Sequence, residues 1–326
     1  MTRIDLITGI LGSGKTTFLL GYARHLTAQG KKIAILENDF GAVNVDILML
    51  QELQGENCQL EMVSGGCDPD CHKRRFKTQL IALGMQHLDR VIIEPSGIFD
   101  MDEFFDILHE SPLDKWFETG SIITIADAGM EEEMSDQMEY LLASETACCG
   151  KLLLSKTEQH GDMTHEEAAE RTAAHINRAL ADIKCDRTIK PSDIYPKGLT
   201  ELTDADYTAL ENAGYRGSAY IKKYLPEDIQ STVHYFMNIR MEDAHIPELL
   251  SGIFNDSRCG KIYRIKGSLP TSGGGWIKIN STPSKLETDL MEKGQSVLIV
   301  IGDGIDKSAV DAHISAVNTD PEYVSI

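Results

Sequence analysis

The sequence has no long apolar run and relatively few basic residues. No stretch approaches the ~20 apolar residues that a membrane-spanning helix needs, so we expect no membrane segment. The 326 residues include 31 Lys or Arg against 51 Asp or Glu, a formal net charge of −20. Because phosphate backbones and anionic lipids repel this excess of acid, we expect no binding to nucleic acid or to a membrane surface.

Repeats, low-complexity segments and histidine-rich tracts are also absent, and the last absence argues against bulk metal storage. The chain length suggests about two domains that can bury a sizeable core. Seven cysteines are an odd number in a long chain, so a framework of disulfides is not expected. Clustered thiols are better interpreted as metal ligands or as core residues.

The stretch from Gly9 to Thr17 is the most informative motif. It reads Gly, four residues, then Gly-Lys-Thr, which is the phosphate-binding loop pattern, and it lies between the apolar run Ile4–Ile7 and a helical pattern. In such loops backbone N–H groups surround the phosphates, and the helix N-terminus adds a positive dipole. The alternative is an ordinary glycine-rich turn, against which the lysine and both flanks argue.

This loop predicts a site for a nucleoside triphosphate and Mg²⁺. Lys15 is expected to reach the β- and γ-phosphates, and the Thr16 hydroxyl to hold the metal ion. The loop residues predicted to contact nucleotide are Gly9, Gly12, Ser13, Gly14, Lys15, Thr16 and Thr17. Because the motif begins so close to Met1, we expect no signal peptide and therefore a cytoplasmic protein.

Apolar runs alternate with helical stretches along the first half of the chain. This alternation predicts an α/β fold with a doubly wound, mostly parallel sheet. Ligand-binding residues are then expected at the carboxyl ends of the strands. The predicted strands are Ile4–Ile7, Ile33–Leu36, Leu60–Val63, Val91–Ile93, Ile122–Ala126 and Leu152–Leu154.

A smaller α+β domain is expected after the parallel sheet, so we predict domains at 1–228 and 229–326. Before the boundary, Thr164–Ala181 has the pattern of an exposed helix. After it, the pattern predicts strands at Val233–Met241, Lys261–Lys266, Gly275–Ile279 and Val297–Ile301, and helices at Ile246–Phe254 and Lys307–Val317.

Glu94 and Gly97 follow the run Val91–Ile93. An acid that ends a buried strand opposite a phosphate loop is the usual partner of Mg²⁺ or its water shell, so Glu94 and Lys15 are predicted catalytic residues. The N–H of Gly97 is expected to approach the γ-phosphate. A strand that ends in a turn with a solvated glutamate is the alternative.

Ser155, Lys156 and Glu158 follow the run Leu152–Leu154, where many GTP-binding proteins carry Asn-Lys-x-Asp. The Glu158 carboxylate keeps the two acceptor oxygens that pair with guanine N–H groups. Lys156 can lay its aliphatic stem over the base. These residues favour guanine, and an ordinary strand end is the alternative.

Two further segments carry acids, thiols and an imidazole. In Glu37-Asn38-Asp39 the acids are candidates to position the attacking water, to contact Mg²⁺ or to reach the cysteine loop; Asp39 is the first candidate for orienting water and Asp46 the second. The alternative is that Asp39 caps a turn.

The cysteine loop, Cys67–His72, holds two thiols and an imidazole, which suit Zn²⁺. The alternative is that its two cysteines are reduced and bind no metal.

Taken together, these motifs resemble the CobW-type GTPases, relatives of the HypB and UreG nickel-insertion GTPases. The resemblance covers nearly the whole chain. It rests on Gly9–Thr17, Glu37–Gly41, Gly66-Cys67, Glu94-x-x-Gly97, Ser155–Glu158, His234, Arg264–Gly267 and Ile301–Gly304. It implies a GTP-hydrolysing metallochaperone or metal-cofactor assembly factor, whose nucleotide state is coupled to metal delivery. Hydrolysis is expected to be slow, because no arginine finger is identifiable.

The cysteine loop departs from the family pattern. Family members usually carry Cys-x-Cys-Cys there, and often Glu where this chain has Ala42. The resemblance therefore implies a rearranged site for Zn²⁺ or another transition metal, with Cys67, Cys71 and either His72 or Glu37 as ligands. The expected partner is a client metalloprotein or cofactor-dependent enzyme, and a homodimer is left open.

Two other functions remain. One is a GTPase switch without metal cargo that activates a corrinoid- or metal-dependent partner enzyme, which the altered cysteine loop and Ala42 favour. The other is an ATP-using kinase or ligase. Lys156 and Glu158 argue against the second, as does the lack of a recognisable site for an acceptor substrate.

Overall fold

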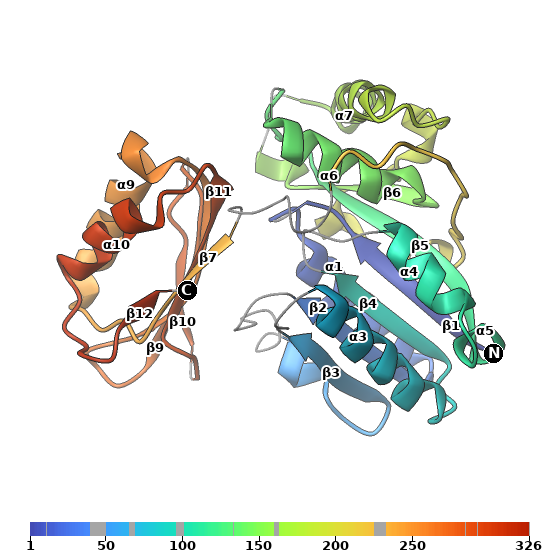
Figure 1. The fold of residues 1–326 in the computed structure, drawn as a ribbon, viewed down its shortest axis with the longest axis horizontal. Helices are drawn as coiled ribbons and strands as arrows, with labels where there is room; N and C mark the ends of the chain where they lie inside the picture. The colour runs from blue at the N-terminus through green and yellow to red at the C-terminus, as the bar shows by residue number, and fades with distance from the viewer. Residues whose placement is uncertain are drawn as a thin grey trace. The chain divides into compact units, whose positions relative to one another are not determined.

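Two compact units make up the chain in the computed structural model (Figure 1). The structure describes residues 1–10, 12–39, 50–64, 69–95, 101–132, 134–159, 163–224, 233–283, 285–291 and 293–325. The described residues of the first unit end at 224, and those of the second begin at 233.

A parallel sheet forms the centre of the first unit. Its six strands within the described residues lie in the order β3-β2-β4-β1-β5-β6, and every neighbouring pair runs parallel. They are β1 (Thr2–Thr8), β2 (Ile33–Asp39), β3 (Cys58–Ser64), β4 (Arg90–Pro95), β5 (Phe117–Asp127) and β6 (Lys151–Ser155). The predicted α/β fold class is confirmed.

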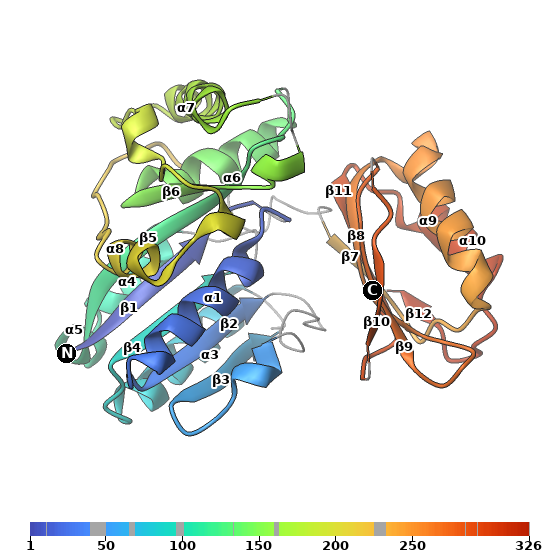
Figure 2. The same cartoon turned by 180° about the vertical axis from the view of Figure 1, so that it is seen from behind.

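Helices cover both faces of this sheet. Figure 1 shows α3 and α4 in front of it, and Figure 2, from behind, shows α1 and α8 in front. The α-helices of this unit in the described ranges are α1 (Lys15–Ala28), α3 (Pro69–Gly84), α4 (Met101–His109), α5 (Leu113–Trp116), α6 (Asp136–Ala147), α7 (His165–Asp182) and α8 (Asp204–Glu211). Short 3₁₀ turns are η1 (Gln51–Leu53), η2 (Thr157–Gln159), η3 (Pro191–Asp193) and η4 (Leu199–Glu201).

Alternation along the strands sets the two faces. Ile33 and Ile35 of β2 pack in one fully buried cluster with Phe18 and Leu26 of α1. Because successive side chains of a strand point to opposite faces, odd-numbered residues of β2 share the α1 face and even-numbered residues share the other. Ile92 of β4 belongs to the same cluster, which places its even-numbered residues on the α1 face.

The helix predicted at Thr164–Ala181 is confirmed within one residue at each end, as α7. It begins at His165 because Thr164 caps it. The Thr164 Oγ1 accepts from the Glu167 N–H at 3.2 Å, and the Glu167 carboxylate accepts from the Thr164 N–H at 2.8 Å. This reciprocal capping box satisfies two N–H groups at the start of the helix.

A buried ion pair joins the first residue of β4 to the middle of β1. Arg90 of β4 donates to the fully buried Asp5 of β1, which also accepts from the Tyr22 hydroxyl and the Ser121 N–H, both at 2.7 Å. Arg90 also donates to the Glu211 carboxylate of α8 at 2.9 Å. Five elements, namely β1, β4, β5, α1 and α8, are therefore joined through one guanidinium and one carboxylate.

The second unit is an antiparallel sheet with helices on one face (Figure 1). Within the described residues the strand order is β10-β9-β8-β11-β7-β12. The strands are β7 (Val233–Met237), β8 (Lys261–Pro270), β9 (Trp276–Ser281), β10 (Thr288–Met291), β11 (Val297–Asp303) and β12 (Val324–Ser325); the helices are η6 (Asp243–His245), α9 (Ile246–Asn255), η7 (Ser257–Cys259) and α10 (Lys307–Ser315). Leu250, Val310 and Leu298 share its buried core.

One strand of this unit is shorter than predicted. We expected a strand at Val233–Met241, and β7 ends at Met237. Asn238 has a φ of 55°, which is left-handed and ends the extended conformation. The strands β10 and β12 were not predicted. In the described ranges, no helix is both long and apolar enough to cross a bilayer.

Replacing Arg90 with Met should destabilise the first unit by about 3–5 kcal/mol, because it leaves the Asp5 carboxylate buried without its cation. The matched control is Arg3→Ala. Arg3 lies in register beside Arg90, but its ion pair with Glu118 is about half exposed and is worth no more than ~1 kcal/mol. Urea unfolding followed by Trp116 fluorescence in a Trp276→Phe background reports the first unit. Equal losses for the two variants would contradict the proposed role of the buried pair.

Candidate functional site

The phosphate loop connects β1 to α1, and its glycines adopt conformations that other residues rarely do. Gly9, Gly12 and Gly14 have φ values of 132°, 85° and 105°. A Cβ on Gly9 would lie 2.2 Å from the Ile125 carbonyl oxygen, and one on Gly14 would lie 3.4 Å from the Ser155 Cβ. The loop therefore needs glycine for its backbone path at all three positions and, at Gly9, for its close approach to β5.

The side chains of the loop differ in their contacts. The Nζ of the buried Lys15 donates to the Gly9 carbonyl oxygen at 2.6 Å, so the ammonium folds over the loop. Ser13 is buried, and its hydroxyl has no hydrogen-bond partner among the described residues. Thr17 is exposed on the first turn of α1. These groups supply positive charge and donors at the start of a helix, which is what phosphate binding needs.

Thr16 and Glu94, the two residues that the sequence predicts to contact Mg²⁺, lie within hydrogen-bonding distance of each other. The Thr16 hydroxyl donates to the Glu94 carboxylate at 3.1 Å. Glu94 is buried and lies at the carboxyl end of β4, next to β1 in the sheet. A hydroxyl and a carboxylate are both oxygen ligands of the kind that Mg²⁺ prefers, so these residues fit the ion.

The end of β2 lies beside this pair. Glu37 is in register with Glu94 on the neighbouring strand, and both side chains are buried. The next residue, Asn38, faces the opposite side of the sheet. There its Oδ1 pairs with the Nε2 of His72 at 2.7 Å. Cys71 precedes His72 in the first turn of α3 and is partly buried with its thiol reduced.

Several predicted site residues lie outside what the structure describes. Cys67, Gly97 and Asp46 fall outside the described ranges, and of Asp39 only the backbone at the end of β2 is described. The structure thus brings together Thr16 with Glu94, Glu37 with Glu94, and His72 with β2. The other predicted contacts of this group stay predictions.

The predicted base loop follows β6. Ser155 is buried, Lys156 is partly buried, and Glu158 is exposed in η2. The Lys156 ammonium forms an ion pair with Asp127 at the end of β5, which holds the lysine stem in place. The sequence analysis assigned no role to Asp127, although it directly follows the predicted strand Ile122–Ala126 and lies beside Ser155 in the sheet.

Glu145 of α6 is a site residue that the sequence reasoning missed. Its Oε2 accepts from the Gly9 N–H at 2.9 Å, which fixes the first residue of the phosphate loop. Its other oxygen has no hydrogen-bond partner within the described residues. Burial raises the pKa of this carboxyl to about 7, although Lys15 and the Gly9 N–H oppose the shift.

A signal for Glu145 was present in the sequence. It is the one charged residue in the stretch from Tyr140 to Gly150, which otherwise consists of apolar and small residues. A lone acid within a helix that is otherwise buried needs a partner. The partner is a loop 136 residues away in sequence, and local pattern contains no information about it.

Comparison with known protein families identifies the nucleotide-binding part of the chain. The model of the CobW/HypB/UreG nucleotide-binding domain matches residues 3–183. The zinc chaperone YjiA of Escherichia coli K12 is 31% identical over 189 residues, which cover 54% of this chain and 55% of that protein. The zinc chaperone YeiR of the same organism is 34% identical over 128 residues, covering 39% of this chain and 38% of that protein.

More extended matches have lower identity. Zinc-regulated GTPase metalloprotein activator 1 of Dictyostelium discoideum is 25% identical over 325 residues, covering 86% of this chain and 63% of that protein. The crystal structure of Zn(II)-bound YjiA GTPase from E. coli covers 98% of this chain and 99% of that one, at 19% identity and a TM-score of 0.36. The chain spans between 38% and 63% of the length of these curated relatives.

Replacing Glu145 with Gln should remove a pH dependence from the stability of the first unit. The folded carboxyl keeps its proton up to about pH 7, whereas the unfolded one loses it near its ordinary pKa of 4.5. The contribution of this carboxyl to stability is therefore fully present below pH 4.5 and is lost as the pH rises to 7, by roughly 3 kcal/mol in all. Gln still offers an oxygen to the Gly9 N–H, but it does not ionise.

Between pH 5 and pH 8, Glu145→Gln should accordingly gain about 2 kcal/mol relative to the parent protein. Urea unfolding followed by Trp116 in the Trp276→Phe background measures this gain. The exposed Glu170 of α7 provides the control, because Glu170→Gln makes the same chemical change in solvent. If Glu145→Gln and the parent keep the same pH dependence, Glu145 is not the titrating group.

Proposed function

The chain belongs to the CobW/HypB/UreG family, and we propose that it is a GTP-hydrolysing chaperone whose nucleotide state controls delivery of zinc. The relatives that are named zinc chaperones support zinc as the cargo. The proposal has two parts, a nucleotide site at the carboxyl ends of the strands and a metal site at the cysteine loop. One strand, β2, contributes a residue to each.

In the nucleotide site, the loop amides and Lys15 would neutralise phosphate charge, and the Ser13 hydroxyl would donate to a phosphate oxygen. Thr16 and Glu94 would hold Mg²⁺, which spreads the negative charge that develops on the transferred phosphoryl group. The N–H of Gly97 would approach the γ-phosphate, and Asp39 or Asp46 would orient the attacking water. Without an arginine finger, hydrolysis is expected to be slow.

In the base site, Glu158 would accept the two guanine N–H groups. Its exposure in η2 leaves the carboxylate accessible to a ligand. The ion pair with Asp127 would hold the Lys156 stem against the ring, and Ser155 would line the pocket beside Gly14. A carboxylate that accepts two N–H groups discriminates strongly, because a base that lacks them leaves its oxygens poorly satisfied.

The Asn38–His72 hydrogen bond carries the coupling between nucleotide and metal. Cys67 and Cys71 would bind zinc at the cysteine loop, with His72 or Glu37 as a further ligand. Glu37 lies beside Glu94 on the nucleotide face of β2, and Asn38 holds His72 on the opposite face at 2.7 Å. Movement of the end of β2 on hydrolysis would thus reach the residue that follows Cys71, and metal affinity would change with it.

Replacing Glu158 with Ala should weaken GDP binding by about 10- to 100-fold and leave ADP binding nearly unchanged, since a bidentate carboxylate contact is worth roughly 1–3 kcal/mol. Competition of GDP and ADP against a fluorescent guanine nucleotide measures the two affinities. The control Glu170→Ala makes the same charge change on exposed α7. A similar loss for both nucleotides would rule out base recognition by Glu158.

Replacing Cys71 with Ser should weaken Zn²⁺ binding at least tenfold, as expected for the loss of one thiolate ligand, and should abolish its dependence on nucleotide. Competition with a chromophoric chelator, in GDP and in a non-hydrolysable GTP analogue with Mg²⁺, measures both effects. Cys185→Ser is the matched control, because Cys185 is also a partly buried, reduced thiol of the first unit. Equal affinities in both nucleotides for the parent protein would favour the switch without metal cargo.

A further inference from the structure

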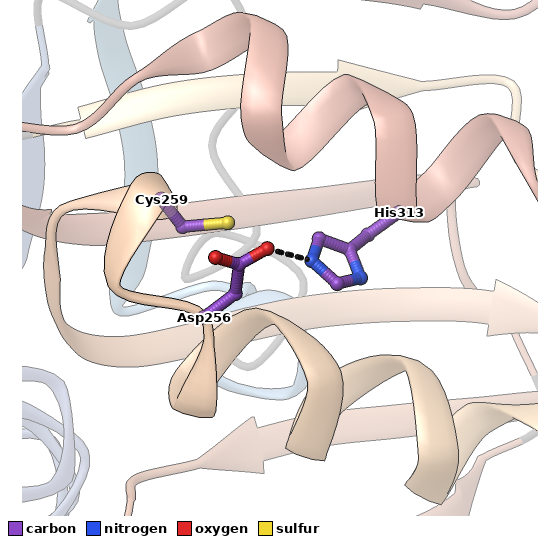
Figure 3. Close-up of side chains that lie close together, drawn as sticks. All are labelled: Asp256, Cys259 and His313. Carbon is purple, nitrogen blue, oxygen red and sulfur yellow. Dashed lines mark hydrogen bonds and ion pairs between the residues drawn. The ribbon is translucent and has the colours of Figure 1, made fainter.

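Three side chains of metal-binding type converge in the second unit (Figure 3). Asp256 follows α9, Cys259 ends η7, and His313 lies near the end of α10. One ligand atom from each residue lies within 4.8 Å of the other two. The Asp256 Oδ2 and the His313 Nε2 are 2.9 Å apart. In a tetrahedral zinc site with ligands at ~2.0–2.3 Å, ligand atoms are separated by roughly 3–4 Å, so only small adjustments are needed.

The local structure holds these side chains together without a metal. The Asp256 carboxylate caps η7 by accepting from the Arg258 N–H at 3.0 Å. Cys259 is fully buried and belongs to the hydrophobic core of the unit. The His313 ring packs against Gly252 of α9, where a Cβ would lie only 3.1 Å from its Nδ1. The ring therefore presents Nε2 toward Asp256.

We propose that Asp256, Cys259 and His313 bind a divalent transition-metal ion of the zinc class through a carboxylate oxygen, the thiolate and the imidazole Nε2. The charges balance, because one carboxylate, one thiolate and a neutral imidazole cancel the two positive charges of the ion. Binding releases one proton, from the Cys259 thiol. Three protein ligands leave the fourth position of a tetrahedral ion for water.

Arg258 competes with the ion for Asp256, and this competition is weak. Its guanidinium donates to both carboxylate oxygens, from Nε at 3.0 and 3.1 Å and from Nη2 at 2.6 Å. The Arg258 side chain is nevertheless 80% exposed. An ion pair with one partner so open to water is weakened by solvent screening. The arginine can therefore turn into solvent when a metal takes its place.

The ion can reach the cluster from the surface. The side chain of His313 is 26% exposed and that of Asp256 is 13% exposed, while Cys259 lies beneath them. All three residues belong to the second unit, whereas the cysteine loop belongs to the first. The site is thus separate from the one in the proposed function and does not depend on it.

Co²⁺ titration of the reduced full chain, with Cys67→Ser and Cys71→Ser to remove the loop thiols, tests the proposal. A thiolate-to-cobalt absorption band in the near ultraviolet is expected in this background. Adding Cys259→Ala should abolish the band, and adding His313→Ala should weaken Co²⁺ binding at least tenfold. Cys58→Ala in the same background is the control and should leave the band unchanged, because Cys58 belongs to no group of metal-binding side chains within the described residues.

Absence of the band in the background protein, or its survival in Cys259→Ala, would overturn the proposal. The cluster would then be a structural Arg–Asp–His network. If the Cys259→Ala variant does not fold, thermal unfolding of the His313→Ala variant tests the site instead. Zn²⁺ should raise the Tm of the background protein by several degrees and that of His313→Ala by little. Equal shifts would reject the site.

Discussion

The strands of the first unit all run in one direction, and the arrangement of the candidate site depends on this constraint. Parallel strands bring their carboxyl ends to the same edge of the sheet. The phosphate loop after β1, Glu94 at the end of β4 and Glu37 at the end of β2 therefore meet, although they are far apart in sequence. The Thr16–Glu94 hydrogen bond is a direct consequence, since β1 and β4 are neighbours in the sheet.

Polar residues hold β1 at its middle and at its carboxyl end, and this fixes the position of the loop that follows. In the middle of the strand, Asp5 pairs with Arg90 beneath α1. At the carboxyl end, Glu145 accepts from the Gly9 N–H. Both are buried, so each is costly unless its partners stay in place. A phosphate loop gains from such rigidity, because its amides bind phosphate without first being ordered.

Local pattern was sufficient to predict the parallel sheet and its six strands within the described residues, because buried strands are short apolar runs bounded by turns. It also placed Thr16 and Glu94 at the carboxyl edge of that sheet, because Thr16 lies in the loop–helix segment after β1 and Glu94 lies at the end of β4. It was not sufficient for Glu145 or for the Asn38–His72 pair, which depend on contacts between distant segments. The edge strands β10 and β12 were missed because they are only 4 and 2 residues long and mostly exposed. The metal cluster of the second unit was missed for the same reason as Glu145: Asp256 and His313 are 57 residues apart.

Consecutive residues of β2 explain how one strand can serve both faces of the sheet. Glu37 has the parity of Ile33 and Ile35, which pack on α1, and Asn38 has the opposite parity. A change in the groups that contact the Glu94 carboxylate would act on the neighbouring Glu37. It would thereby displace the backbone of β2, which also carries Asn38. His72 would move with Asn38 because their hydrogen bond is buried, and a buried partner is costly to lose. Coupling between nucleotide and cysteine loop therefore requires neither a long loop nor the second unit; it requires only that the end of β2 moves as a rigid piece.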